Sequence, residues 1–174
     1  MDLTPLKIKA SHCDEESFLS AYGGIYEHST WIALGAWANR ASGNLDTVGG
    51  LHQEMMNTIG AASEAGKMTL ICAHPDLAGK LAVSDELTAE SKSEQAGAGL
   101  DQCTAEEFTE FQSLNQAYKE KFAFPFIIAV KGHDRQSILA SFRARINNDR
   151  PAEFETALQE IDKIAFFRLT ALTE

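Results

Sequence analysis

The stretch TAEEFTEFQSLNQAYKEKF, residues 104–122, constrains the fold more than any other part of the chain. Thr104 followed by Glu107 is the signature of a capping box, in which two side chains satisfy the first free N–H groups of a helix. Apolar side chains then recur at helical spacing, at Phe108, Phe111, Leu114, Tyr118 and Phe122. We therefore expect a long helix that starts at Thr104 and buries one face.

Helical spacing also marks the N-terminal third of the chain. Gly23 and Gly24 are expected to end a first helix, which Asp14 caps and whose apolar face holds Phe18, Leu19 and Tyr22. The segment EHSTWIALGAWANR predicts a second helix with a buried stripe made of Trp31, Leu34 and Trp37 or Ala38. The next apolar pattern predicts a third helix through Leu51, Met55, Ile59 and Ala62.

Two further helices are expected near the C-terminus. The segment SILASFRARI places Leu139, Phe142 and Ile146 on one face. Pro151 suits the first turn of a closing helix, because proline lacks an N–H that this turn does not need. The apolar face of that closing helix comprises Phe154, Leu158, Ile161, Ala165 and Leu172.

Two short apolar runs are ambiguous from spacing alone. MTLICAH, residues 68–74, fits a buried strand or a helix, and we favour a helix because no partner strand is evident. Pro75 biases His74 away from the α region, so the backbone should break there in either case. FAFPFIIAVKG, residues 122–132, contains Pro125 and fits a broken helix or an extended buried segment.

These patterns predict one all-α domain of seven to nine helices over residues 1–174. The chain of 174 residues has the length of one domain, and it shows no repeat, no low-complexity tract and no linker. The formal net charge of −10 argues against nucleic-acid binding, since no basic stripe is present to contact phosphates. The start lacks an apolar signal core and no apolar run approaches a membrane span, so we expect a cytoplasmic protein without membrane contact.

Two polar motifs contain candidate functional residues. His74 lies between an apolar run and a proline, where it is either a core histidine at a helix end or a positioned general acid or base. Ser91, Glu94 and Gln95 are spaced so that one helical turn brings a hydroxyl, a carboxylate and an amide together. The alternative for this second motif is a solvated turn with flexible glycines.

The apolar run before Lys131 is a third candidate. An interrupted apolar segment leaves backbone N–H and C=O groups that need partners, and a bound heterocycle can supply them. The plainer interpretation is that these side chains are core and that Lys131 is a surface lysine. The five histidines show no HxH, HxxxH or HExxH spacing and the three cysteines form no CxxC pair, so we expect no metal site.

The motifs HPDLAGK, SKSEQAGAGLDQ and FQSLNQAYKEKFAFPFIIAVKG, in this order, resemble the OHCU decarboxylases. This family degrades 2-oxo-4-hydroxy-4-carboxy-5-ureidoimidazoline (OHCU), a product of uric acid breakdown, to (S)-allantoin. FLSAYGGIYEHSTWIALGAW and ALQEIDKIAFFRLTAL also resemble its first block and closing helix, so the resemblance covers residues 14–172. It implies an all-helical, commonly homodimeric enzyme of purine catabolism that uses no cofactor and no metal.

The resemblance also implies roles for individual residues. His74 corresponds to the proton donor and Pro75 lines the same site. Glu94 corresponds to the carboxylate of the family's substrate-binding turn, and our hypothesis is that it orients the substrate ring and holds His74 in the required tautomer. The remaining residues expected to bind substrate are Ser91, Gln95, Ile127, Ile128, Ala129, Val130 and Lys131. The resemblance assigns no role to Arg135, Arg143 or Arg168. A lyase or hydrolase for a related ureide, or a helical interaction module without catalysis, remains an alternative.

Overall fold

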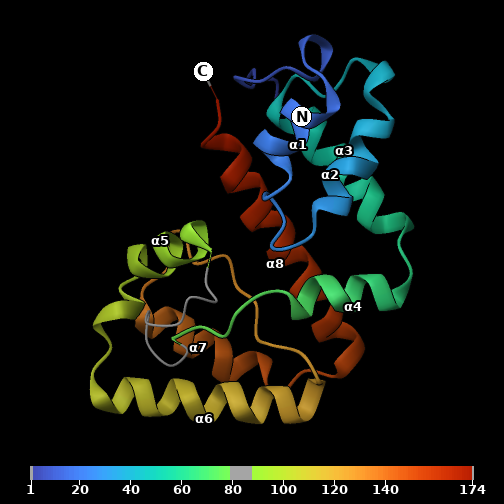
Figure 1. Ribbon diagram of the computed structural model, residues 1–174. Coiled ribbons are helices and arrows are strands. Elements are labelled where there is room, and N and C mark those ends of the chain that lie inside the picture. The colour runs from blue at the N-terminus through green and yellow to red at the C-terminus, as the bar shows by residue number, and fades with distance from the viewer. Residues whose placement is uncertain (1, 79–87, 174) are drawn as a thin grey trace. The chain divides into compact units, whose positions relative to one another are not determined.

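The computed structural model describes residues 2–78 and 88–173 (Figure 1). Within these residues the chain forms eight α-helices and three short 3-10 helices, and its only extended pairings are two isolated bridges. The all-α prediction is therefore confirmed, and eight helices fall within the predicted range of seven to nine. None of the described helices is both long enough and apolar enough to cross a bilayer.

The residues group into two compact units. One unit comprises Met1–Ala73 with Ile161–Glu174, and the other comprises His74–Glu160. The interpretation of the whole chain as one domain over residues 1–174 stays a prediction. All the candidate site residues, from His74 to Lys131, belong to the second unit.

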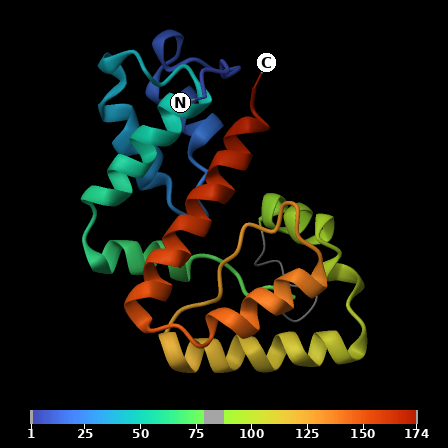
Figure 2. The same ribbon diagram turned by 180° about the vertical axis from the view of Figure 1, so that it is seen from behind.

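The first unit contains α1 (Glu15–Tyr22), α2 (Thr30–Ala38), α3 (Val48–Ala61), α4 (Glu64–Cys72) and the part of α8 (Arg150–Thr170) that starts at Ile161. The Asp14 side chain accepts a hydrogen bond from the Ser17 N–H, and α1 ends immediately before Gly23, so both predictions for this helix are confirmed. Helices α2 and α3 lie side by side (Figures 1 and 2). They pack closely at Gly35, where an added Cβ would lie 2.4 Å from Thr58 Cγ2.

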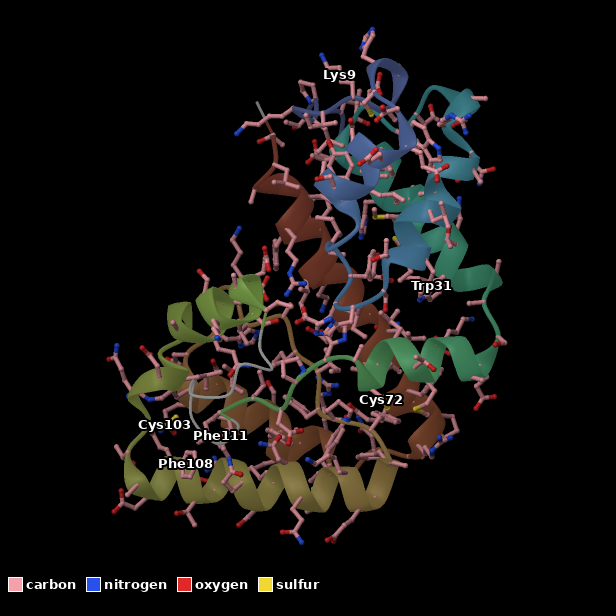
Figure 3. All side chains as sticks on the ribbon, viewed as in Figure 1. Lys9, Trp31, Cys72, Cys103, Phe108 and Phe111 are labelled. Carbon is pink, nitrogen blue, oxygen red and sulfur yellow. The ribbon has the colours of Figure 1, made fainter. Side chains whose placement is uncertain are left out.

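The predicted buried face of α2 is confirmed at Trp37 and is wrong at Trp31 and Leu34. Ile32, Ala33, Ala36 and Trp37 are buried, whereas Trp31 and Leu34 are 37% and 45% exposed. Figure 3 shows Trp31 on this helix. Spacing failed here because TWIALGAWA is apolar at nearly every position, so no periodic contrast marks the face that packs against the rest of the unit.

The run MTLICAH forms the end of a helix, as expected. Helix α4 is capped by Ser63, whose Oγ accepts from the Gly66 N–H, and it ends at Cys72. The backbone leaves the helix at His74, which precedes Pro75. The predicted break is therefore confirmed.

The second unit contains α5 (Ala89–Gly97), α6 (Ala105–Phe122), α7 (Arg135–Arg145) and the part of α8 up to Glu160. The capping box between Thr104 and Glu107 is present at the start of α6. Helices α6 and α7 pack together (Figures 1 and 2), and the Phe111 and Phe142 rings lie 6.4 Å apart between centroids.

The apolar part of FPFIIAVKG is extended and buried, whereas Lys131 and Gly132 at its end are exposed. Residues 124–130 are all buried and belong to no helix or strand, which decides between the two interpretations of this run. Aromatic packing holds its start, since the Phe126 ring stacks on Phe142 with 3.8 Å between centroids and meets Tyr118 edge-on. Pro151 lies in the first turn of α8, as predicted, but that helix ends at Thr170 and does not include Leu172.

Candidate active site

His74 lies in the first turn of chain after α4. Its neighbour Ala73 still has helical backbone angles, with φ −72° and ψ −18°, and His74 begins the irregular segment that follows. The His74 side chain is buried, with 8% of the residue exposed, and Pro75 is half-buried. An imidazole at this position is largely shielded from water, which strengthens its electrostatic interactions.

The SKSEQ motif lies on α5. Thr88 caps this helix, because its Oγ1 accepts a hydrogen bond from the Ser91 N–H at 3.2 Å. Ser91 is buried, and Glu94 and Gln95 are half-buried. The prediction that the three residues share one helical turn is confirmed. The interpretation of this motif as a solvated turn is wrong for Ser91, which is 5% exposed.

A hydrogen bond joins this helix to the segment that follows His74. The Gln95 Oε1 atom accepts from the Ala78 N–H at 3.2 Å. With its oxygen occupied, the Gln95 amide has its NH2 group left to donate to an acceptor. A hydrogen bond therefore joins the first candidate motif, HPDLAGK, directly to the second, SKSEQ. The last two residues of HPDLAGK lie outside the described residues.

Two side chains hold the third candidate segment, one at Ile127 and one at Ala129. The Ile127 carbonyl accepts from Arg145 Nη1 at 2.7 Å, and the Ala129 N–H donates to Glu160 Oε2 at 2.9 Å. In the part of the chain that the structure describes, no protein group hydrogen-bonds the N–H or the C=O of Ile128, which is 6% exposed. Buried backbone groups need partners, so Ile128 can offer one donor and one acceptor to a bound molecule.

The remaining residues of this segment differ in exposure. Val130 is buried and its carbonyl accepts from the His133 N–H at 2.9 Å. Lys131 is exposed, which fits the plainer interpretation of a surface lysine as well as a role at the edge of a site.

Sequence reasoning missed a buried polar network behind this segment. Glu153 is 0% exposed, and its carboxylate accepts hydrogen bonds from the Tyr118 hydroxyl, from Arg145 Nε at 2.8 Å and from Asn148 Nδ2 at 2.8 Å. The Arg145 guanidinium carbon also lies 4.4 Å from the centroid of the Phe126 ring. Burial raises the pKa of Tyr118 well above its usual value, so this hydroxyl remains a donor.

Two side chains of α6 contact the segment that follows His74. The sequence analysis did not single out either of them. Asn115 Nδ2 donates to the Leu77 carbonyl at 2.8 Å, and Gln112 Nε2 donates to the Ala78 carbonyl at 2.8 Å. Asn115 carried a signal in the sequence, because it lies at helical spacing between Phe111 and Tyr118 on the buried face. A polar residue on an apolar stripe indicates a buried hydrogen bond.

The three arginines without an assigned role are paired in the structure. Arg135 and Arg143 form ion pairs with Glu107 and Glu110 at 3.0 and 2.6 Å. Arg168 belongs to the first unit, where Glu27 accepts its hydrogen bond at 2.9 Å and both side chains are buried.

A polar groove of about 620 Å³ lies on the second unit. It is lined by Asp76, Thr109, Gln112, Ser113, Asn115, Gln116, Lys119 and Glu120. None of the candidate site residues lines it. Among residues 2–78 and 88–173, no three His, Cys, Asp or Glu side chains gather in a way that could hold a metal ion.

Comparison with known proteins identifies the family. Residues 11–170 match the family model described as OHCU decarboxylase. The chain is 41% identical over 163 residues to the 2-oxo-4-hydroxy-4-carboxy-5-ureidoimidazoline decarboxylase of Halalkalicoccus jeotgali, covering 94% of this chain and 89% of that one. It is 33% identical over 165 residues to the mouse protein of the same name, covering 95% and 91%. The chain therefore belongs to the OHCU decarboxylase family.

Solved structures show the same fold. A crystal structure of (S)-allantoin synthase superposes with a TM-score of 0.75 at 29% identity, and the match covers 95% of this chain and 54% of that one. An OHCU decarboxylase crystallised in the presence of (S)-allantoin superposes with a TM-score of 0.66 at 22% identity, covering 91% and 98%. The second likeness, at this identity, concerns the fold alone.

Proposed function

We propose that the protein is a carboxy-lyase that decarboxylates OHCU to (S)-allantoin in the degradation of uric acid. Membership of the OHCU decarboxylase family over residues 11–170 carries this proposal. The relatives from Halalkalicoccus jeotgali and mouse are both named as OHCU decarboxylases, and the match covers 89% and 91% of their lengths.

The chemistry requires no external electron sink. The bond between the hydroxyl-bearing ring carbon and its carboxylate breaks, CO2 leaves, and the electron pair delocalises into the C=N bond of the neighbouring, ureido-bearing carbon. A proton then adds to one face of that ureido-bearing carbon, while the hydroxyl on the first carbon loses its proton and becomes a ring carbonyl through an enolate. The site must therefore orient the carboxylate, stabilise the oxyanion and deliver the proton from one side.

His74 is the proposed proton donor. Its burial supports this role, because a shielded imidazole next to a rigid proline has few orientations and delivers its proton to one face. Pro75 lines the same site. Glu94 orients the substrate through its ureido or hydroxyl group and sets the tautomer of His74.

The other predicted residues bind the heteroatoms of the substrate. Ser91 contributes its hydroxyl, and Gln95 contributes the NH2 group that remains once its oxygen has accepted from Ala78. The segment of Ile127, Ile128, Ala129, Val130 and Lys131 holds the ring and ureido group. The N–H and C=O of Ile128 are the backbone groups best suited to this contact. The Ile127 carbonyl and the Ala129 N–H already bond protein side chains.

The resemblance further supports a homodimer in the cytoplasm. Size-exclusion chromatography with light scattering measures the first point directly, and a mass near 38 kDa is expected because one chain is 19.0 kDa. A mass near that of one chain at micromolar concentration contradicts the dimer without affecting the proposed reaction.

Freshly generated OHCU tests the reaction. The protein should accelerate the decay of its ultraviolet absorbance and produce allantoin with the circular dichroism of the (S) enantiomer. An interaction module leaves only the slow spontaneous decay to racemic product, and an enzyme for another ureide leaves that decay unchanged while binding its own ligand. Glu94→Gln should keep the fold and lose much of the rate, and an unchanged rate would limit Glu94 to a structural part.

A further inference from the structure

The segment that follows His74 and Pro75 is held by side chains and by no regular secondary structure. Three consecutive residues, Asp76, Leu77 and Ala78, each bond a different residue on one face of α6. Lys119 Nζ lies 2.6 Å from Asp76 Oδ2, Asn115 donates to the Leu77 carbonyl, and Gln112 donates to the Ala78 carbonyl.

These three helix residues form an ordered row. Gln112, Asn115 and Lys119 are spaced by three and four residues, which places them on one face of α6. The segment runs antiparallel to α6. Each successive residue of the segment therefore bonds a helix residue that lies one turn closer to the start of α6. The row therefore fixes both the position and the direction of the chain directly after Pro75.

Ala78 shows why the segment needs this support. Its φ is +46°, in the left-handed region that residues with a side chain rarely adopt. Its N–H donates to Gln95 and its carbonyl accepts from Gln112, so both of its backbone polar groups are bound by side chains. A strained conformation persists only where the surroundings determine it in this way.

The contacts in the row differ in burial. Asn115 is 3% exposed, so its bond to the Leu77 carbonyl is shielded from water. The Lys119 side chain is 48% exposed, and an ion pair at that exposure contributes little. Asn115 and Gln112 therefore hold the segment more firmly than Lys119 does.

We propose that Asn115 and Gln112 are positioning residues for His74. They bond the backbone two and three residues beyond Pro75, and they thereby fix where the His74 ring lies. The inference rests on the proposed function, because it concerns the aim of the proton donor. Neither residue needs to touch the substrate, and Gln95 takes part in both tasks, since it bonds Ala78 and is proposed to bind substrate.

The test compares Asn115→Leu and Gln112→Met with Gln116→Met. Asn115→Leu removes the buried donor at similar volume, and Gln112→Met removes the half-buried one. Gln116 is the matched control, because it is exposed on the same helix and its amide donates to Glu120 at 2.9 Å, away from the segment.

With OHCU, the two test variants should lose about ten- to a hundred-fold in kcat with KM changed less than about three-fold, as expected for a misplaced catalytic group. The enantiomeric excess of the allantoin should also fall. A smaller fraction of folded enzyme does not lower the enantiomeric excess, once the racemic product of the spontaneous decay has been subtracted. Gln116→Met should match wild type in all three quantities. Wild-type kcat and enantiomeric excess in folded Asn115→Leu and Gln112→Met would overturn the inference.

The ring signals of His74 in NMR spectra provide a readout that does not depend on turnover. They should shift in Asn115→Leu and Gln112→Met and stay in place in Gln116→Met, with His12, His28, His52 and His133 as internal references. Unchanged His74 signals in both variants contradict the inference. If the wild type decarboxylates OHCU, the proposed function still holds in that case. If Asn115→Leu fails to fold, Gln112→Met alone gives the result, since it leaves the buried Asn115 bond in place.

Discussion

Replacing Arg145 should destabilise the protein strongly, because it separates a buried ion pair. The Arg145 and Glu153 side chains are 14% and 0% exposed. Arg145→Met leaves the Glu153 carboxylate buried with Tyr118 and Asn148 as its donors. The same change frees the Ile127 carbonyl, at the start of the segment proposed to bind substrate.

The expected loss can be assembled from these contacts. Removing one partner of a buried ion pair costs about 3–5 kcal/mol, since the other charge stays in a medium of low polarity. The lost hydrogen bond to the Ile127 carbonyl adds about 1 kcal/mol. Arg145→Met should therefore lose about 4–6 kcal/mol, a large part of the roughly 5–15 kcal/mol that stabilises a typical domain.

Two companion variants show whether the cause is the uncompensated charge. In Arg145→Met with Glu153→Gln the buried carboxylate becomes a neutral amide, so at least about 2 kcal/mol of the loss should return. Arg143→Met is the control two residues earlier on α7, where the pair with Glu110 is 52% and 37% exposed, and it should cost no more than about 1 kcal/mol.

Urea unfolding followed by circular dichroism gives the unfolding free energy of each variant. The reasoning is refuted if Arg145→Met costs less than about 1 kcal/mol, or if the double variant is no more stable than Arg145→Met alone. The decarboxylation assay run beside it should show a raised KM in Arg145→Met, because Ile127 loses its anchor.

Two further predictions concern the first unit. Gly50→Ala should lower the free energy of unfolding by more than about 2 kcal/mol, because the new Cβ would lie 1.8 Å from the backbone oxygen of Asn44. Gly60→Ala is the control on the same helix, where the new Cβ meets nothing within 4 Å. Thermal unfolding should show a gain of up to about 1 kcal/mol for this control. Burial raises the pKa of Asp162 above its ordinary 3.8, although the hydrogen bond from Tyr26 lowers it. The folded state thus holds this proton more tightly than the unfolded state, so the stability of wild type relative to Asp162→Asn should fall as pH rises from about 4 through the folded pKa. A difference that stays constant or rises over that range contradicts this cause.

Local patterns predicted the helices whose ends and faces have strong contrast. The capping box at Thr104 and the cap at Asp14 lie where expected, because each depends on side chains within three residues of the backbone groups that they satisfy. The face of α2 could not be predicted in the same way, since a helix that is apolar all round gains from burying any side.

The support of the candidate site depends on contacts between residues far apart in the sequence. Asn115 bonds a carbonyl 38 residues earlier in the chain, and Ala129 bonds a carboxylate 31 residues later. No spacing rule encodes such pairs, because the fold that brings them together depends on the packing of every helix in the unit. The roles of His74, Glu94 and Gln95 come from resemblance to a family, and they stay predictions until variants are measured.

The enantiomeric excess of allantoin made by wild type and by His74→Asn tests the central claim most directly. If His74 delivers the proton, wild type gives (S)-allantoin, while the folded variant gives the slow rate and racemic product of the spontaneous decay. A His74→Asn variant that makes (S)-allantoin at a rate near that of wild type would contradict the assignment of His74 as the proton donor.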